Sequence, residues 1–307
     1  MKIKKSLSLP QLKTSRTAVL DGRQKSELKK IFEGRGLCGT LGCKRNQKIS
    51  RHRELHEEKA ILLCSRTPHS KECGFNVRDR RTLVMSLGGS VIIPEQKNDN
   101  FLLKLRATLK KYYRTHKFVL VCGGGSIARA YITLLEKEHK NHREQSEAGI
   151  RATRMNAELI MQVFGKEANS ALPKNMKSVR SELHKNNVVV SGALRYAPHQ
   201  TSDTTAAKLA AYLKSEFVNL TNVPGLYTSD PRKNKAAKLI PHISWKEFEA
   251  KAHAIRFSPG EHFVLDQKAS TLIRKHKIKT FIMGKDANNL KKFLNNEKWL
   301  GTQIDSQ

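Results

Sequence analysis

The sequence predicts an α/β fold, a three-layer α/β/α sandwich built around a mostly parallel central sheet. From residue 81 onward, short apolar runs of strand length alternate with longer segments that have helical periodicity. Such an alternation is typical of a parallel sheet that helices cover on both faces. Two glycine clusters also follow apolar runs directly, at positions where a strand turns into the next element.

The predicted elements follow one another in a regular order. Residues 83–94 form an apolar run split by two glycines, which we interpret as a strand, a tight turn and a continuation. One face of a helix over 101–114 consists of Phe101, Leu105, Leu109 and Tyr112. Further strands are expected at 117–122, 187–192, 217–221 and 279–283. Further helices are expected at 126–138, 151–164, 203–214 and 266–276, and a capping box of Ser244 and Glu247 opens another.

The chain is strongly basic. It has 307 residues, with 58 Lys and Arg against 27 Asp and Glu, a formal net charge of +31. This charge favours anionic partners such as nucleotides, nucleic acid or an anionic membrane surface, and a lysine-rich composition without such a partner is the alternative. No run approaches 18 apolar residues, and the basic N-terminus has no apolar segment behind it, so we expect neither a membrane span nor secretion. The odd number of five cysteines argues against a disulfide scaffold, and we expect a cytoplasmic location.

The first 80 residues differ in character from the rest. They contain 20 Lys and Arg, 8 Asp and Glu, and few apolar periodicities. We expect a basic, poorly ordered N-terminal extension over 1–80 and a folded domain over 81–307. Nucleic acid would bind only through this extension. Four cysteines lie in it, Cys38, Cys43, Cys64 and Cys73, but their spacing is looser than the close pairs typical of zinc sites.

The glycine clusters are the strongest candidates for a phosphate site. Gly88 and Gly89 end one predicted strand, and Gly123, Gly124 and Gly125 end the next. Ligands of open α/β sheets bind beyond the carboxyl ends of the strands, where glycine N–H groups and helix N-termini favour anions. Arg129 lies one turn into the helix predicted after Gly125. The chain has neither the P-loop motif nor the protein-kinase motifs, so another phosphate-binding fold is required.

These turns, together with the segments after them, resemble the amino acid kinase family, and within it the uridylate kinases of archaeal type. The likeness covers roughly residues 83–304 in the family's order and does not reach the first 80 residues. The segments that carry it are Ser86–Val91, Val121–Arg129, Gly149–Ala157, Thr221–Pro231, Lys238–Phe248 and Ser258–Asp266.

The resemblance implies a nucleoside monophosphate kinase that uses ATP and Mg²⁺ to convert UMP to UDP, in pyrimidine nucleotide biosynthesis. It implies that ATP lies against Gly88, Gly89, Gly125, Arg129, Thr221, Asn222, Tyr227 and Asp230. It implies that UMP lies against Gly124, Pro198, His199, Gln200 and Thr201. It also implies a homo-oligomer, since members of this family are usually oligomeric and often form hexamers.

The catalytic candidates are Gly88, Gly89, Arg129 and Asp203. Transfer to an acceptor that is already anionic needs positioning and charge neutralisation rather than a strong base. Asp203 follows Thr201 closely and is a candidate for orienting the acceptor or the metal, and the alternative is an ordinary acid in the first turn of a helix.

Three positions depart from the family's pattern. Pro224 stands where the family usually has Asp, and His199 stands where glycine is expected. Ser146 replaces the acid that commonly binds the UMP ribose, although Glu147 is adjacent. These departures keep two alternatives open, a kinase for another small phosphate or carboxylate and a non-catalytic nucleotide-binding protein. An RNA-associated factor that acts through the basic extension is a further alternative.

Overall fold

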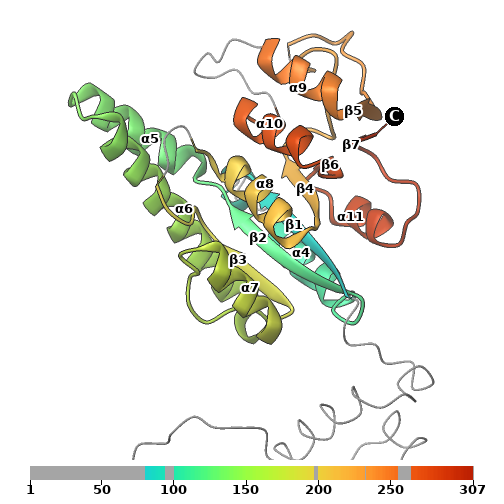
Figure 1. Ribbon diagram of the computed structural model, residues 1–307, viewed down its shortest axis with the longest axis horizontal. Coiled ribbons are helices and arrows are strands. Elements are labelled where there is room, and N and C mark those ends of the chain that lie inside the picture. Colours follow the sequence, from blue (N-terminus) through green and yellow to red (C-terminus); the bar gives the residue numbers. More distant parts are fainter. Residues whose placement is uncertain (1–79, 94–99, 197–199, 232, 255–263, 307) are drawn as a thin grey trace, which may run out of the picture. The chain divides into compact units, whose positions relative to one another are not determined.

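A single seven-stranded sheet forms the centre of the described part of the chain (Figure 1). The computed structural model describes residues 80–93, 100–196, 200–231, 233–254 and 264–306. The strand order is β3-β2-β1-β4-β6-β7-β5, and only the β6–β7 pair in this sheet is antiparallel. The strands are β1 (Arg81–Leu87), β2 (His116–Cys122), β3 (Val188–Ser191), β4 (Glu216–Thr221), β5 (His242–Ser244), β6 (Thr280–Gly284) and β7 (Thr302–Asp305). The predicted mostly parallel sheet is thus confirmed.

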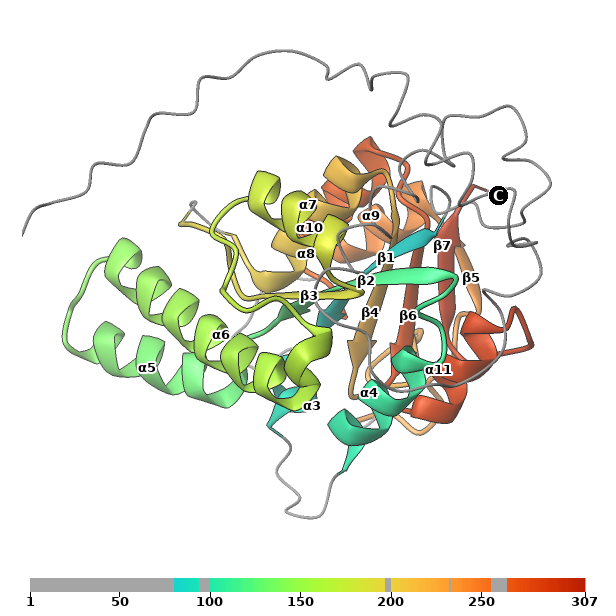
Figure 2. The same cartoon turned by 90° about the horizontal axis from the view of Figure 1, so that it is seen from below.

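Helices cover both faces of the sheet (Figures 1 and 2). The helices are α3 (Gly89–Ile92), α4 (Phe101–Lys110), α5 (Gly125–Lys137), α6 (His142–Phe164), α7 (Met176–Lys185), α8 (Ser202–Leu213), α9 (Trp245–Ala254), α10 (Gln267–Lys275) and α11 (Ala287–Leu294). One core contains buried residues of α3, α4, α6 and α11, and the other those of α7, α8, α9 and α10. Alternate residues of one strand enter the two cores, since Leu83 and Met85 of β1 pack in the first and Val84 in the second. This arrangement confirms the three-layer prediction.

Helix α6 is longer than the sequence indicated, because it begins at His142 rather than near residue 151. Asn141 caps it by accepting from the N–H groups of Arg143 and Glu144, and the Glu144 carboxylate accepts from Asn141 N–H at 3.2 Å. Helix α5 runs along α6 and has no fully buried residue, and the two helices extend beyond the sheet (Figures 1 and 2). Within the described residues, no helix has the length and apolarity to cross a bilayer.

The prediction that the first strand continues after its glycine turn was wrong. The chain forms the short helix α3 instead, because the N–H groups of Val91 and Ile92 both donate to the carbonyl of Gly88. The helix predicted over 101–114 ends at Lys110, and Tyr112 lies in the turn that follows. The described elements α7, α11, β5 and β7 have no counterpart among the predicted ones.

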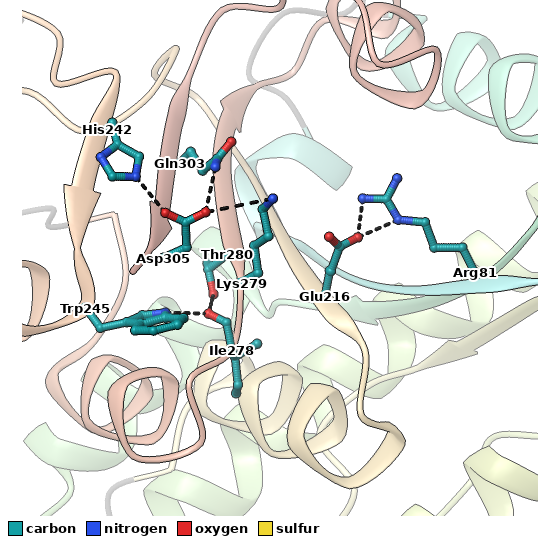
Figure 3. A network of polar contacts seen from close by, with 9 residues as sticks. All are labelled: Arg81, Glu216, His242, Trp245, Ile278, Lys279, Thr280, Gln303 and Asp305. Carbon is teal, nitrogen blue, oxygen red and sulfur yellow. Dashed lines mark hydrogen bonds and ion pairs between the residues drawn. The ribbon is translucent and has the colours of Figure 1, made fainter. Parts of the chain in front are cut away.

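A polar network stabilises the sheet at the amino ends of β1, β4 and β6 (Figure 3). Arg81 pairs with Glu216. Asp305 near the end of the chain accepts from His242 Nε2 and from Gln303 Nε2, both at 2.6 Å, and lies 3.8 Å from Lys279 Nζ. Burial by itself raises the pKa of Asp305, but these donors and charges outweigh it, so the pKa is lower than usual. The network therefore ties the antiparallel strand β7 to its neighbours through an ionised carboxylate.

This network predicts that the acid stability of the domain depends on Asp305. Because the folded-state pKa lies below the unfolded value, its contribution is present above about pH 4 and is lost as the pH falls further. Asp305→Asn should lower the free energy of unfolding at pH 7 by about 1 kcal/mol and flatten its decline in acid. Urea unfolding at several pH values measures this. Parallel stability curves for the variant and the wild type would contradict it.

Candidate active site

The two glycine turns lie side by side at the carboxyl ends of β1 and β2. The last residues of these strands, Leu87 and Cys122, are paired in register, and Gly123 N–H donates to the Leu87 carbonyl at 2.8 Å. A Cβ atom on Gly89 would lie 2.0 Å from the backbone nitrogen of Gly125 and 2.2 Å from its Cα. The backbones of the two turns are therefore in direct contact, and no side chain fits between them.

The second turn leads directly into helix α5. Gly125 has a φ of +63°, which glycine adopts without strain. Gly124 is the N-cap of α5 and has no side chain to accept from the N–H groups of the first turn. Those donors and the positive end of the helix dipole favour an anion at this position. Arg129 lies exposed on the same helix, four residues after Gly125 and so at the start of its second turn.

Asp203 lies directly beneath the turns, on the first turn of helix α8. Its Oδ1 accepts a hydrogen bond of 2.5 Å from Ser86 Oγ, and Ser86 is two residues before Gly88 on β1. Desolvation is the main cause that raises the pKa of Asp203 to about 7, and nearby Asp266 raises it further, whereas the Ser86 hydrogen bond opposes the change. A carboxyl group with a pKa this far above its ordinary value is typical of a functional site.

Asp266 is a site residue that the sequence did not single out, although it lies in one of the family-like segments. It caps α10 by accepting from Ala269 N–H at 2.8 Å. The same carboxylate accepts from Thr201 Oγ1 at 2.5 Å and from Thr204 Oγ1 at 3.0 Å, both at the start of α8. Asp266 thus fixes the start of α8, where Asp203 lies, against the start of α10. The sequence signal for it was an Asp immediately before a helical stretch.

The residues expected around adenosine lie at the end of β4 and in the loop that follows. Thr221 pairs with Gly284 of β6, and Asn222 Nδ2 donates to Ser90 Oγ at 2.8 Å, which links this loop to the first glycine turn. Tyr227 bridges to Leu239 across the loop, and the Asp230 carbonyl accepts from Asn234 N–H at 2.9 Å.

A cavity of about 360 Å³ opens beside the carboxyl ends of β4 and β6. Asn222 is the one residue of the expected adenosine set among its lining, which also includes Pro224, Lys285, Asn288, Asn289 and Lys292. The lining also contains the carboxylate of Asp286, so its amide, ammonium and carboxylate groups suit a polar ligand.

The segment expected to bind the acceptor is described only from Gln200 onward, and Pro198 and His199 lie outside the described residues. Thr201 is the N-cap of α8, and its hydroxyl accepts from Thr204 N–H at 3.1 Å in addition to donating to Asp266. The Gln200 side chain donates to Thr205 Oγ1 at 2.9 Å and accepts from Lys208 Nζ at 2.7 Å. The structure therefore brings Gly88, Gly89, Gly124, Gly125 and Asp203 together, with Thr201 tied to them through Asp266.

Comparison with known proteins agrees with this geometry. The model of the amino acid kinase family matches residues 81–284, which contain every described element from β1 to β6. The chain belongs to the amino acid kinase family. The resemblance noted in the sequence is thus confirmed.

Relatives of this chain include archaeal uridylate kinases. The chain is 34% identical over 217 residues to the uridylate kinase of Methanococcus aeolicus, an alignment that covers 70% of this chain and 95% of the relative. It is 33% identical over 210 residues to that of Thermococcus kodakarensis, covering 68% and 92%. The crystal structure of uridylate kinase from Archaeoglobus fulgidus superposes with a TM-score of 0.63 at 29% identity, covering 72% of this chain and 99% of that one.

Two of the three departures from the family pattern, Ser146 and Pro224, lie in the described part of the chain, and His199 lies outside it. Glu147, the acid next to Ser146, pairs with Arg143 one turn earlier on α6 at 3.0 Å. Pro224 lines the cavity beside Asn222, and a Cβ on Gly284 would lie 3.4 Å from the Pro224 Cα. Neither position interrupts the contact between the glycine turns.

The contact between Gly89 and Gly125 predicts that a single added methyl group lowers both stability and nucleotide affinity in this kinase. Gly89→Ala forces the two turns apart, so we expect a loss of about 2–3 kcal/mol of stability and of most nucleotide affinity. Gly165→Ala is the matched control, because Gly165 has a φ of +57° but nothing within 4 Å of its Cβ position. It carries only backbone strain, because a φ of +57° with a ψ of −132° is a conformation that L-residues rarely adopt, and nucleotide binding should persist. Chemical unfolding and calorimetric titration with ATP measure stability and affinity, and an equal loss of ATP affinity in the two variants would contradict the prediction.

Proposed function

We propose that this protein transfers the γ-phosphoryl group of ATP to the phosphate of UMP and releases ADP and UDP. An oxygen of the UMP phosphate attacks the γ-phosphorus while the bond from that phosphorus to the β-phosphate oxygen breaks. The observation that carries the proposal is the direct contact between the two glycine turns. Two phosphate groups bound at turns whose backbones touch are held close together, and positioning is the main requirement of this reaction.

The roles of the residues follow from their places in the fold. Gly88 and Gly89 lie at the end of β1, where their backbone would face the ATP phosphates. Gly124 would face the UMP phosphate, and Gly125 with Arg129 would face ATP and neutralise the developing charge. Thr221, Asn222, Tyr227 and Asp230 would hold the adenosine. Pro198, His199, Gln200 and Thr201 would line UMP.

Mg²⁺ is part of the proposal as a companion of ATP. Among the described residues, no group of three or more His, Cys, Asp and Glu side chains is arranged to hold a metal ion. This fits Mg²⁺ bound to nucleotide phosphates, which takes only one or two carboxylates from the protein and keeps several waters. Asp203, as the carboxylate beneath the glycine turns, suits that role. Bound Mg²⁺ would supply charge neutralisation on the phosphate oxygens.

The raised pKa of Asp203 predicts an unusual trade-off between stability and activity. Between about pH 4 and pH 7 the folded state holds a proton that the unfolded state has lost, so wild-type stability falls as the pH rises through this range. Asp203→Asn removes the ionisation while keeping an acceptor for Ser86. It should be more stable than the wild type at pH 8, by about 1–3 kcal/mol, with little difference at pH 4.

The same variant should lose about tenfold or more of kcat, because an amide no longer supplies the negative charge. Thermal unfolding at the two pH values and steady-state kinetics give the two readouts. Full activity in Asp203→Asn would show that the residue is only a first-turn helix acid. A variant that is no more stable than the wild type at pH 8 would contradict the raised pKa of Asp203.

A coupled assay of ADP release tests the function directly. The purified protein with ATP and Mg²⁺ is offered UMP, other nucleoside monophosphates, and small phosphate and carboxylate compounds. We expect turnover that depends on UMP and exceeds turnover with the other acceptors at least tenfold in kcat/KM. Equal use of all acceptors would refute the UMP assignment. Binding of ATP and UMP by calorimetry without turnover would select the non-catalytic alternative.

Three further points belong to the same proposal. We propose that the kinase domain spans 81–307 and that the basic segment 1–80 is an extension outside it, as the family match from residue 81 supports. A homo-oligomer, with a hexamer as the expected form, is testable by light scattering. A cytoplasmic location is expected for an enzyme that uses ATP and UMP.

A further inference from the structure

The middle of helix α6 touches the acceptor side of the site through a single helical turn. This turn contains Thr153, Arg154 and Asn156, of which Thr153 is 7% exposed and Asn156 is 1% exposed. Its neighbour is the chain after β3, from Gly192 to Leu194, which leads into the segment expected to bind UMP.

Thr153 completes the hydrogen bonding of that chain. Its Oγ1 accepts from the N–H of Ala193 at 2.9 Å and donates to the Ile150 carbonyl at 2.7 Å. Ala193 is 7% exposed, so water cannot readily replace this acceptor. A buried N–H group without a partner is costly, so the hydroxyl fixes the position of the chain at Ala193.

Arg154 holds the next two peptide groups. Its Nη2 donates to the Leu194 carbonyl at 2.8 Å, and its Nε donates to the Ala193 carbonyl at 3.3 Å. The guanidinium is planar and binds two carbonyl groups in one fixed geometry, which a lysine would not reproduce.

The backbones meet at the same place. A Cβ on Gly192 would lie 2.8 Å from the backbone nitrogen of Arg154 and 2.8 Å from the Thr153 carbonyl oxygen. Three residues further along α6, Asn156 Nδ2 donates to the Gly123 carbonyl at 2.7 Å, at the base of the second glycine turn. One turn of α6 therefore joins the chain after β3 to the turn expected to hold the acceptor phosphate.

We propose that Thr153 and Arg154 are positioning residues for the acceptor nucleotide, a role that rests on the proposed function. They fix the chain at Ala193 and Leu194 relative to Gly123 and Gly124, so that the base and the phosphate of one nucleotide are held at a set separation. Neither residue touches the donor side of the site through these contacts. Their loss should therefore weaken acceptor binding selectively.

Three variants test this. Thr153→Val is nearly the same size and lacks the hydroxyl, and Arg154→Met keeps the apolar stem without the donors. Each should raise KM for UMP about tenfold, because a misplaced loop no longer matches its ligand, while KM for ATP changes less than about twofold. Thr153→Ser retains the hydroxyl and should restore KM for UMP to near the wild-type value.

Thr302→Val is the matched control. Thr302 is fully buried, and its Oγ1 accepts from Leu226 N–H at 2.8 Å and donates to the Ile240 carbonyl at 2.6 Å, the same pair of contacts that Thr153 makes. Its loss causes comparable destabilisation away from the acceptor loop, so KM for UMP should stay within about twofold of the wild type. If KM for UMP rises as much in Thr302→Val as in Thr153→Val, the effect comes from general destabilisation, and the inference is overturned.

The outcomes separate the inference from the proposed function. If the wild type phosphorylates UMP but Thr153→Val and Arg154→Met leave KM for UMP unchanged, the positioning role is refuted and the function stands. If the wild type does not phosphorylate UMP, the function fails. Amide hydrogen exchange then still tests the contact, because Ala193 N–H should be protected in the wild type and exchange at least tenfold faster in Thr153→Val. Equal exchange in the two proteins would overturn the inference. If Arg154→Met is the only variant that folds, exchange at Ala193 N–H in that variant decides the case in the same way.

Discussion

The site depends on the backbone contact between Gly89 and Gly125. Parallel strands β1 and β2 end level with each other, and each continues into a helix, so the two connections would compete for one space if either carried a side chain. Glycine at both positions allows the connections to touch. The contact leaves backbone N–H groups of both turns at one edge of the sheet, where the N-terminus of α5 adds a partial positive charge. Phosphate affinity here would come from the backbone more than from side chains.

The surrounding side chains serve mainly to fix that backbone. Ser86 on β1, Asp203 on α8 and Asp266 at the start of α10 form a layer beneath the turns, and Asn156 on α6 holds the second turn from the other side of the sheet. The layer places a half-buried carboxyl group where water solvates it poorly, which costs stability above its pKa. Such a cost is typical of residues kept for function rather than for folding.

The sequence predicted the strands and glycine turns well because buried parallel strands have a simple signal. The runs that became β1, β2, β3, β4 and β6 are apolar on both faces and end at glycine or a polar residue. The short strands β5 and β7 lack that signal, since each has only three or four residues and includes polar ones such as His242, Gln303 and Asp305. Their pairing depends on tertiary contacts, which no local pattern encodes. The first nine residues of α6 were missed for a related reason, because that segment packs against α5 instead of the sheet and needs no apolar stripe of the usual width.

The same reasoning explains which parts of the site escaped prediction. Motifs revealed the groups that would face a ligand, because glycine clusters and an N-cap threonine can be recognised in the sequence alone. The residues that hold those groups in place did not stand out, because Thr153, Asn156 and Asp266 gain their meaning from partners 40, 33 and 62 positions away. Two of them carried a usable signal. Asp266 stands immediately before a helical stretch. Asn156 is a polar residue on a largely apolar helical face and must find a hydrogen-bond partner when buried. In this fold the groups that would face the two phosphates could therefore be predicted from the sequence, whereas the packing that would fix their separation becomes visible only when α6, α8 and α10 are placed against the sheet.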